Sequence, residues 1–223
     1  MSADLIISYD GTPNDDDALA LGKLLALSGA RPALAYVRHA REFDPGREEI
    51  ASHDADRRLE SGAAWFGEPA IPRHVVISSS TGEGLIQLAH QEGASVVVFG
   101  SDYRTPPGRA EPGNTAQRLL DGGPVAVAVA AAGLRARAEV KIESIAVFGP
   151  GDDAAVAETA RSLADKLGAT VNPNGAGRAD LIVVGSPPSG GPGRTGVSGL
   201  QRSVLNSALG SVLVLPYGKP LVL

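Results

Sequence analysis

Four aspartates near the start of the chain are the first residues whose types and spacing could do chemistry. Asp10 directly follows the hydrophobic run LIISY (5–9), and Asp15, Asp16 and Asp17 come shortly after it. Carboxylates grouped in this way can hold a divalent metal ion or act as general acid and base. They can also begin a helix, because the positive end of the helix dipole attracts negative charge.

The residues from Thr12 onward have the pattern of a helix start. Thr12 suits the N-cap, Pro13 suits the first helical position, and Asp15 is placed to complete a capping box. Asp16 and Asp17 then fall in the first turn, where the dipole stabilises a carboxylate by about 0.3–1 kcal/mol. This interpretation accounts for Asp15, Asp16 and Asp17 without a metal ion.

Asp10 occupies a different kind of position. It ends the expected strand, and open parallel sheets bind ligands at the carboxyl ends of their strands. A simple turn formed by Asp10 and Gly11 explains the residue equally well. Nucleoside hydrolases and haloacid dehalogenase phosphatases would each place an aspartate two residues before Asp10, where this chain has Ser8. Neither hydrolase family is supported.

The passage FGSDYRTPPGRAEPGNTAQRLL (99–120) is the second candidate for chemistry. A strand ends in Gly-Ser, a loop rich in proline and glycine follows, and Gly-Asn-Thr opens a helix. Glycines let the backbone approach a ligand closely, and the free N–H groups of a helix start attract phosphate. Arg104 and Arg109 could neutralise its charge. A mobile connection between a strand and a helix is the alternative.

Other catalytic and binding motifs find little support. A Walker phosphate loop and a G-x-S-x-G nucleophile elbow do not occur, and the four histidines lie in separate segments without metal-ligand spacing. GPGRTG (191–196) matches the dinucleotide fingerprint G-x-G-x-x-G. However, no acidic residue follows Asp180, so nothing could hold the ribose about 20 residues further on.

Short apolar runs alternate with amphipathic segments, which is typical of an α/β fold. Strands are expected in LIISY (5–9), ALAYV (33–37), HVVIS (74–78), SVVVFG (95–100) and VAVAVA (125–130). Helices are expected at 15–28, 47–66, 84–92 and 114–120. This order predicts an open, mostly parallel sheet with helices on both faces, in a complete domain over residues 1–132.

The rest of the chain repeats this pattern in a shortened form. ADLIVVGS (179–186) parallels SVVVFGS (95–101), and QRSVLNSALGSVLVL (201–215) parallels QRLLDGGPVAVAV (117–129). We therefore expect two tandem sheets, with a linker at 133–142 and a truncated second domain at 143–223. The last strands of the two units, VAVAVA and SVLVLP, are predicted to pair in an intramolecular pseudo-dimer, because apolar edge strands need covering. A homodimer is left open.

Composition narrows the function classes. Net charge is −5 and no face of clustered positive charge is evident, which argues against nucleic acid as a partner. No apolar run reaches the roughly 18 to 20 residues of a membrane span, and the first residues lack the features of a secretory signal. The absence of cysteine is compatible with a reducing compartment, so a cytoplasmic protein without membrane contact is expected.

The strand VVVFGS (96–101), its loop, the following QRLL helix and the closing strand PVAVAV (124–129) resemble the universal stress protein family. Nucleotide-binding members of that family carry G-x2-G-x9-G-[ST]. Gly100 and Gly113 occupy the first and last glycine positions, Tyr103 stands at the middle one, and Asn114 replaces the hydroxyl residue, with Thr115 beside it. The likeness covers residues 3–130 and, in shortened form, 143–216.

The resemblance implies an adenine nucleotide, ATP or AMP, across the strand ends. Asp10 would face the ribose or a phosphate-bound Mg²⁺, and Val37 would offer its backbone to the adenine. The expected binding residues are Asp10, Gly11, Val37, Gly100, Ser101, Gly113, Asn114 and Thr115.

A stress-response binding or regulatory protein is therefore predicted, and not an enzyme, because no activated nucleophile, triad or metal cluster is evident. Two alternatives stay open. One is a slow nucleotide hydrolase that uses Asp10 with Mg²⁺. The other is a scaffold that has lost its ligand, which Tyr103 and Asn114 favour, whereas Asp10 with Gly100 and Gly113 favours binding.

Overall fold

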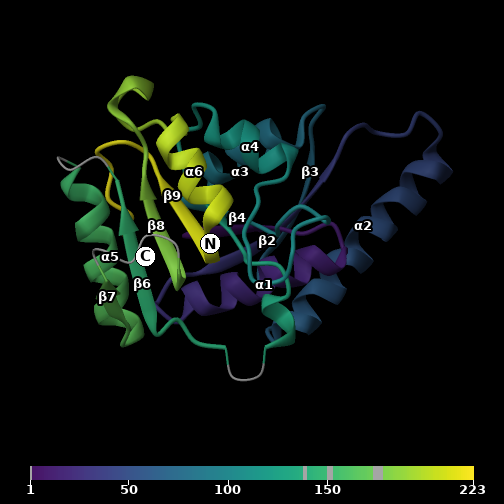
Figure 1. Ribbon diagram of the computed structural model, residues 1–223. Coiled ribbons are helices and arrows are strands. Elements are labelled where there is room, and N and C mark those ends of the chain that lie inside the picture. Colours follow the sequence, from purple (N-terminus) through teal and green to yellow (C-terminus); the bar gives the residue numbers. More distant parts are fainter. Residues whose placement is uncertain (1, 138–139, 150–152, 173–177) are drawn as a thin grey trace.

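The computed structural model describes residues 2–137, 140–149, 153–172 and 178–223. Nine strands form one sheet in the order β3-β2-β1-β4-β5-β9-β8-β6-β7, and helices cover its faces (Figure 1). The predicted α/β class with a mostly parallel central sheet is confirmed. None of the helices in the described part of the chain combines the length and hydrophobicity that a bilayer span requires.

The first half contributes five strands, all parallel to one another. β1 lies between β2 and β4. β2 and β3 therefore lie on one side of β1, and β4 and β5 lie on the other. The elements are β1 (Leu5–Ser8), α1 (Pro13–Ala26), β2 (Pro32–Arg38), α2 (Pro45–Phe66), β3 (Arg73–Ile77), α3 (Thr81–Glu92), β4 (Val96–Phe99), α4 (Asn114–Leu120) and β5 (Ala126–Val129).

The second half is shorter and begins after a single 3₁₀ turn. Part of the predicted linker forms this turn, η1 (Leu134–Ala136), whose Leu134 is buried. The remaining elements are β6 (Ser144–Phe148), α5 (Ala154–Leu167), β7 (Thr170–Asn172), β8 (Arg178–Gly185), η2 (Pro188–Gly190), α6 (Gly199–Ser207) and β9 (Leu209–Leu215). Residues 150–152, before α5, and 173–177, between β7 and β8, lie outside the described residues.

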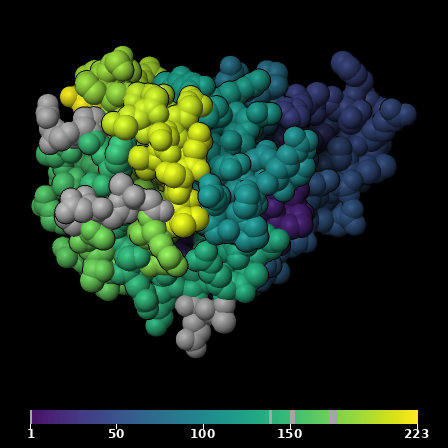
Figure 2. Space-filling model, in the orientation of Figure 1, coloured from purple at the N-terminus to yellow at the C-terminus, as the bar shows by residue number. Residues whose placement is uncertain are grey.

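The two halves share one sheet, where two were expected. β5 pairs antiparallel with β9, with Val127 opposite Val214 and Val129 opposite Val212. The pairing of the last strands is thus confirmed. It also merges the two sheets, because each strand supplies the hydrogen-bonding partners that the other's open edge lacks. Figure 2 shows α6, in yellow, against the teal segment of the first half.

Helix boundaries follow from local chemistry. α1 begins with the predicted capping box of Thr12 and Asp15, and Pro13 is its first residue. α2 begins at an aspartate cap, Asp44, and ends at Gly67, whose φ of 86° lies in the left-handed region that glycine tolerates. The central strands β1, β4 and β5 are buried on both faces of the sheet, whereas the edge strands β3 and β7 are partly exposed. The core therefore forms two layers, one beneath each set of helices.

Candidate functional site

A hollow of about 290 Å³ opens at the carboxyl ends of β1, β2 and β4. The hollow lies beside β1, which pairs with β2 at one edge and with β4 at the other. Open α/β sheets bind ligands at such a switch point in the strand order. The lining of the hollow combines strand ends with the first residues of α3 and α4. The lining residues are Ser8, Tyr9, Asp10, Asp15, Ala35, Tyr36, Val37, His39, Thr81, Phe99, Gly100 and Thr115.

Asp15 fixes the turn that leads from β1 into α1. Its Oδ2 accepts hydrogen bonds from the backbone N–H of Asp10 at 3.1 Å, from the N–H of Thr12 at 2.9 Å and from Thr12 Oγ1 at 2.7 Å. Gly11, at φ 83°, makes the turn itself and lies outside the lining of the hollow. The helix-start interpretation of Asp15 is therefore confirmed, although its carboxylate also faces the hollow.

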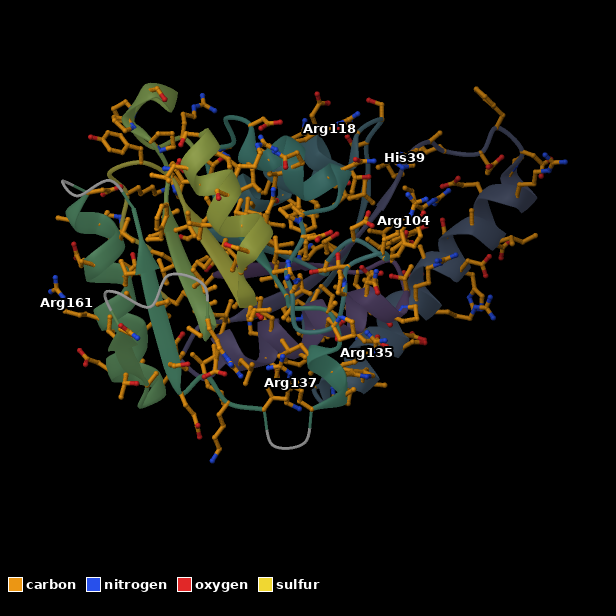
Figure 3. All side chains as sticks on the ribbon, in the orientation of Figure 1. His39, Arg104, Arg118, Arg135, Arg137 and Arg161 are labelled. Atoms are coloured by element: carbon orange, nitrogen blue, oxygen red, sulfur yellow. The ribbon has the colours of Figure 1, made fainter. Side chains whose placement is uncertain are left out.

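Asp17 has a role that the helix-dipole argument did not predict. The residue is buried, and its carboxylate accepts 2.8 Å hydrogen bonds from the backbone N–H groups of Gly133 and Arg135. The Arg135 guanidinium, which lies beside α1 in Figure 3, donates a third bond at 2.8 Å. Asp17 thus attaches α1 to the turn that leads into the second half.

Tyr9, which lines the hollow, and the nearby Asp16 have raised pKa values. Burial, with the nearby Asp16 and Asp15 carboxylates, raises the pKa of Tyr9 to about 12. Burial also raises the pKa of Asp16 above its ordinary range, against the opposing effects of Arg135 and of the hydrogen bond with Tyr9. Tyr9 is therefore a neutral hydrogen-bond donor at physiological pH.

Asp10 stands at the rim of the hollow and is paired with Arg58 of α2. The Arg58 guanidinium donates to the Asp10 carbonyl oxygen at 2.7 Å and lies 3.3 Å from its carboxylate. It also lies over the ring of Tyr36, 5.4 Å from the centroid. Partial burial and the Asp15 carboxylate nevertheless raise the pKa of Asp10, against the lowering by Arg58 and His39.

Asp10 is poorly suited to hold Mg²⁺ through protein ligands. A neighbouring guanidinium repels a divalent cation, and Mg²⁺ requires six oxygen ligands in near-octahedral geometry. Among the described residues, no group of three or more His, Cys, Asp or Glu side chains could hold a metal ion. Asp10 as a metal ligand stays a prediction, and the other ligands would have to come from phosphates and water.

Val37 lies on the wall of the hollow, as expected. β2 runs on to Arg38 whereas β1 ends at Ser8, which pairs with Ala35. The backbone around Val37 therefore extends past its neighbouring strand into the hollow. This is the position from which backbone groups could pair with a planar base.

Gly100 also lines the hollow, but its missing side chain has a packing reason. A Cβ there would lie 2.1 Å from the carbonyl oxygen of Asn14, in the first turn of α1. The next residue, Ser101, is buried and outside the lining. Its hydroxyl donates to the carbonyl of Ala130 at 2.6 Å, and its own carbonyl accepts from Asn14 Nδ2 at 3.0 Å.

The loop after Ser101 is tied back on itself by hydrogen bonds. Asp102 N–H donates to the carbonyl of Glu111, and Glu111 N–H donates to Ser101 Oγ. Tyr103 is 72% exposed, and the guanidinium of Arg104 lies over its ring, 4.9 Å from the ring centroid. Tyr103 therefore does not fill the hollow, and Arg104 is turned toward that ring.

The three residues that open α4 differ in their relation to the hollow. Thr115 lines it, Asn114 is exposed, and Gly113 forms the N-cap with ordinary backbone angles. No described atom lies within 4 Å of the Cβ that a side chain at Gly113 would add. Neither the backbone nor the packing of the described residues therefore requires glycine at position 113, unlike Gly100.

Comparison with known proteins identifies this arrangement. Residues 2–131 match the model of the Universal stress protein family. The chain belongs to the universal stress protein family. No curated protein matches it significantly in sequence. The universal stress protein of Archaeoglobus fulgidus DSM 4304 has a similar structure, with a TM-score of 0.72 and 15% identity over 95% of this chain and 97% of that chain.

Two Pseudomonas aeruginosa structures share the fold of this universal stress protein family member. A functionally unknown protein from strain PAO1 has a TM-score of 0.61 and 14% identity, over 97% of this chain and 93% of that chain. A putative universal stress protein from strain UCBPP-PA14 has a TM-score of 0.59 and 13% identity, over 97% and 94%. At these identities the likeness extends to the fold alone.

Several residues in or beside the hollow of this family member were not predicted from sequence. Tyr36 and His39 flank the predicted Val37, Thr81 opens α3, and Arg58 reaches the site from the middle of α2. The proximity of Tyr36 and His39 to Val37 was a usable signal. No sequence signal pointed to Arg58, because its contact with Asp10 joins residues 48 positions apart in the sequence.

Proposed function

We propose that this stress-response family member is a binding or regulatory protein that takes an adenine nucleotide, ATP or AMP, in the hollow beside Asp10. The observation that carries the proposal is the position of the hollow. It lies at the switch point of the sheet, between the ends of β1, β2 and β4, where ligands bind in folds of this class.

The lining supports a nucleoside in a defined orientation. The apolar surfaces of Ala35, Val37 and Phe99 would provide a wall for a base, and the end of β2, which runs past the end of β1, would provide backbone hydrogen-bonding groups for its edge. Asp10 and Thr115 stand where they could bond to ribose hydroxyls. Ligand pockets usually measure about 300–1,000 Å³, so this hollow suits a nucleoside with its phosphates outside.

The chemistry of the site favours binding over turnover. Asp10 is the carboxylate most exposed to a ligand, yet Arg58 occupies its side and no described cluster of metal ligands accompanies it. Slow hydrolysis with Mg²⁺ would have to rely on that single carboxylate. We therefore derive no catalytic step.

A ligand-free scaffold is a second candidate, and one observation favours it. The loop residues that would be expected to bind phosphates already bond to other parts of the protein. Ser101 bonds to Ala130, and Arg109 Nη1 donates to the carbonyl of Asn206 at 3.0 Å. A chain whose loop serves only to hold its two halves together would show these contacts without any ligand.

Thermal unfolding with adenosine, AMP and ATP, each with and without Mg²⁺, tests the proposal. A ligand at 100 times its dissociation constant adds about 2.7 kcal/mol, or roughly 5–11 °C in Tm for a chain of this size. No shift with any of the three would support the scaffold. Native mass spectrometry of the purified protein would show retained nucleotide and whether the chain forms homodimers, which stays a prediction.

A matched pair of variants locates the binding. Thr115→Trp places an indole in the hollow and should abolish the shift, whereas Asn114→Trp places it on the exposed neighbouring position and should not. Circular dichroism of both variants checks that each is folded. Binding that survives in Thr115→Trp would place the ligand elsewhere.

A further inference from the structure

The loop after β4 has a close counterpart after β8. Ser101 and Ser186 each donate a 2.6 Å hydrogen bond to a carbonyl at the end of a strand: that of Ala130, just after β5, and that of Leu215, the last residue of β9. The spacing is the same for donors and acceptors, 85 residues (101 to 186, 130 to 215).

Further bonds repeat at this spacing. Each serine hydroxyl accepts from a backbone N–H near the end of its loop, and each loop forms two backbone bonds with the segment after its last strand. The bond from Glu111 N–H to Ser101 Oγ corresponds to the bond from Gly196 N–H to Ser186 Oγ. The bond from Gly108 N–H to the Ala132 carbonyl corresponds to that from Gly193 N–H to the Tyr217 carbonyl. The bond from Ala132 N–H to the Arg109 carbonyl corresponds to that from Tyr217 N–H to the Arg194 carbonyl. The two loops are therefore built on one plan.

Each loop reaches across to the other half. Arg109 Nη1 donates to the carbonyl of Asn206, in the last turn of α6, at 3.0 Å, and Arg194 Nη1 donates to the carbonyl of Gly122, just after α4, at 3.2 Å. Thr195 adds bonds from its N–H to the Gly123 carbonyl and from its hydroxyl to the Leu119 carbonyl. Cationic donors suit the carbonyls at a helix end. The two loops act as reciprocal clasps between the halves.

This arrangement keeps both arginines of the first loop, Arg104 and Arg109, out of the lining of the hollow. Arg109 bonds to the second half, and Arg104 lies over Tyr103. Among the described residues, the lining of the hollow includes no lysine or arginine, while Asp10 and Asp15 both face it. The nearby Arg58 lies outside the lining and is already paired with Asp10.

We propose that the hollow selects an adenosine-type ligand carrying at most one phosphate, because the loop that would take further phosphates is a clasp between the halves. The inference rests on the proposed function and specifies its ligand class. One phosphate already carries a charge of about −1.5 to −2 at pH 7. Each further phosphate adds negative charge beside two carboxylates, and the described lining offers no lysine or arginine to offset it.

Isothermal titration of the full chain with adenosine, AMP and ATP tests this selectivity. Affinity should fall as phosphates are added, and adenosine should bind at least about tenfold more tightly than ATP, with or without Mg²⁺. ATP binding as tightly as adenosine in either condition would overturn the inference and leave the proposed function standing. Binding of none of the three would overturn both.

The chain itself offers a matched pair for the clasp. Arg109→Ala and Arg194→Ala remove equivalent bonds, so each should lower Tm by a similar amount and leave the affinity for AMP unchanged within about twofold. A loss of AMP affinity in Arg109→Ala alone would show that Arg109 binds phosphate. An unchanged Tm in both variants would show that the clasp does not hold the halves.

Discussion

Replacing Gly100 with alanine gives the sharpest test of how the end of β4 is built. The added Cβ would lie 2.1 Å from the carbonyl oxygen of Asn14 and 2.6 Å from its carbonyl carbon. Both are backbone atoms in the first turn of α1, so no side-chain rotation can relieve the contact. The start of the helix and the end of the strand must move apart by about 1 Å.

The cost follows from this geometry. Overpacking usually costs about 1–3 kcal/mol, and a backbone obstacle places Gly100→Ala at the upper end. The movement also strains the 3.0 Å hydrogen bond from Asn14 to the carbonyl of Ser101, worth about 0.5–1.5 kcal/mol. We expect a loss near 3 kcal/mol in the free energy of unfolding, which corresponds to about 6–12 °C in Tm.

Differential scanning calorimetry of the two proteins without ligand measures the loss. Gly199→Ala is the control, because no described atom lies within 4 Å of its added Cβ and alanine suits the first position of α6. Its Tm should be unchanged or slightly higher. If Gly100→Ala unfolds at the wild-type temperature, the packing explanation is wrong, and a ligand would be the remaining reason for glycine at this position.

Three further predictions concern carboxylates. Asp17→Ala leaves Arg135 and two backbone N–H groups without their acceptor and should cost roughly 2–4 kcal/mol in urea unfolding. The hydrogen bonds from Arg38 lower the pKa of Glu48 to about 2, so Glu48 contributes stability above pH 4.5 that is lost as the pH falls toward 2. Glu48→Gln should flatten that part of the stability curve. The raised pKa of Asp10 has the opposite sign: its contribution is present at acidic pH and lost as the pH rises through its folded-state pKa. Asp10→Asn should therefore stabilise the ligand-free protein at neutral pH and match wild type in acid.

The elements of the fold were predictable because each apolar run is short and bounded by turn residues. LIISY, SVVVFG and VAVAVA became β1, β4 and β5, with boundaries within two residues. The single sheet was not predictable in full. Local patterns specify strands, whereas the number of sheets depends on whether the edges of β5 and β9 meet, and that pairing joins residues about 85 apart.

The site was predicted only in part, because a motif gives positions along the chain and not side-chain directions. Asp10, Val37, Gly100 and Thr115 do line one hollow. Ser101 and Asn114, one residue away from lining positions, point elsewhere: one bonds to the neighbouring strand end and the other is exposed.

The peptide between Gly100 and Ser101 separates two functions of one connection. The chain before it lines the hollow, and the chain after it bonds to Ala130 and reaches the second half through Arg109. Asn14 contacts both sides, since its carbonyl packs on Gly100 and its side-chain amide bonds to Ser101. A shift in the position of Asn14 would therefore act on Gly100 and on Ser101 together. The end of β4 is consequently where the lining of the hollow and the contacts between the halves meet.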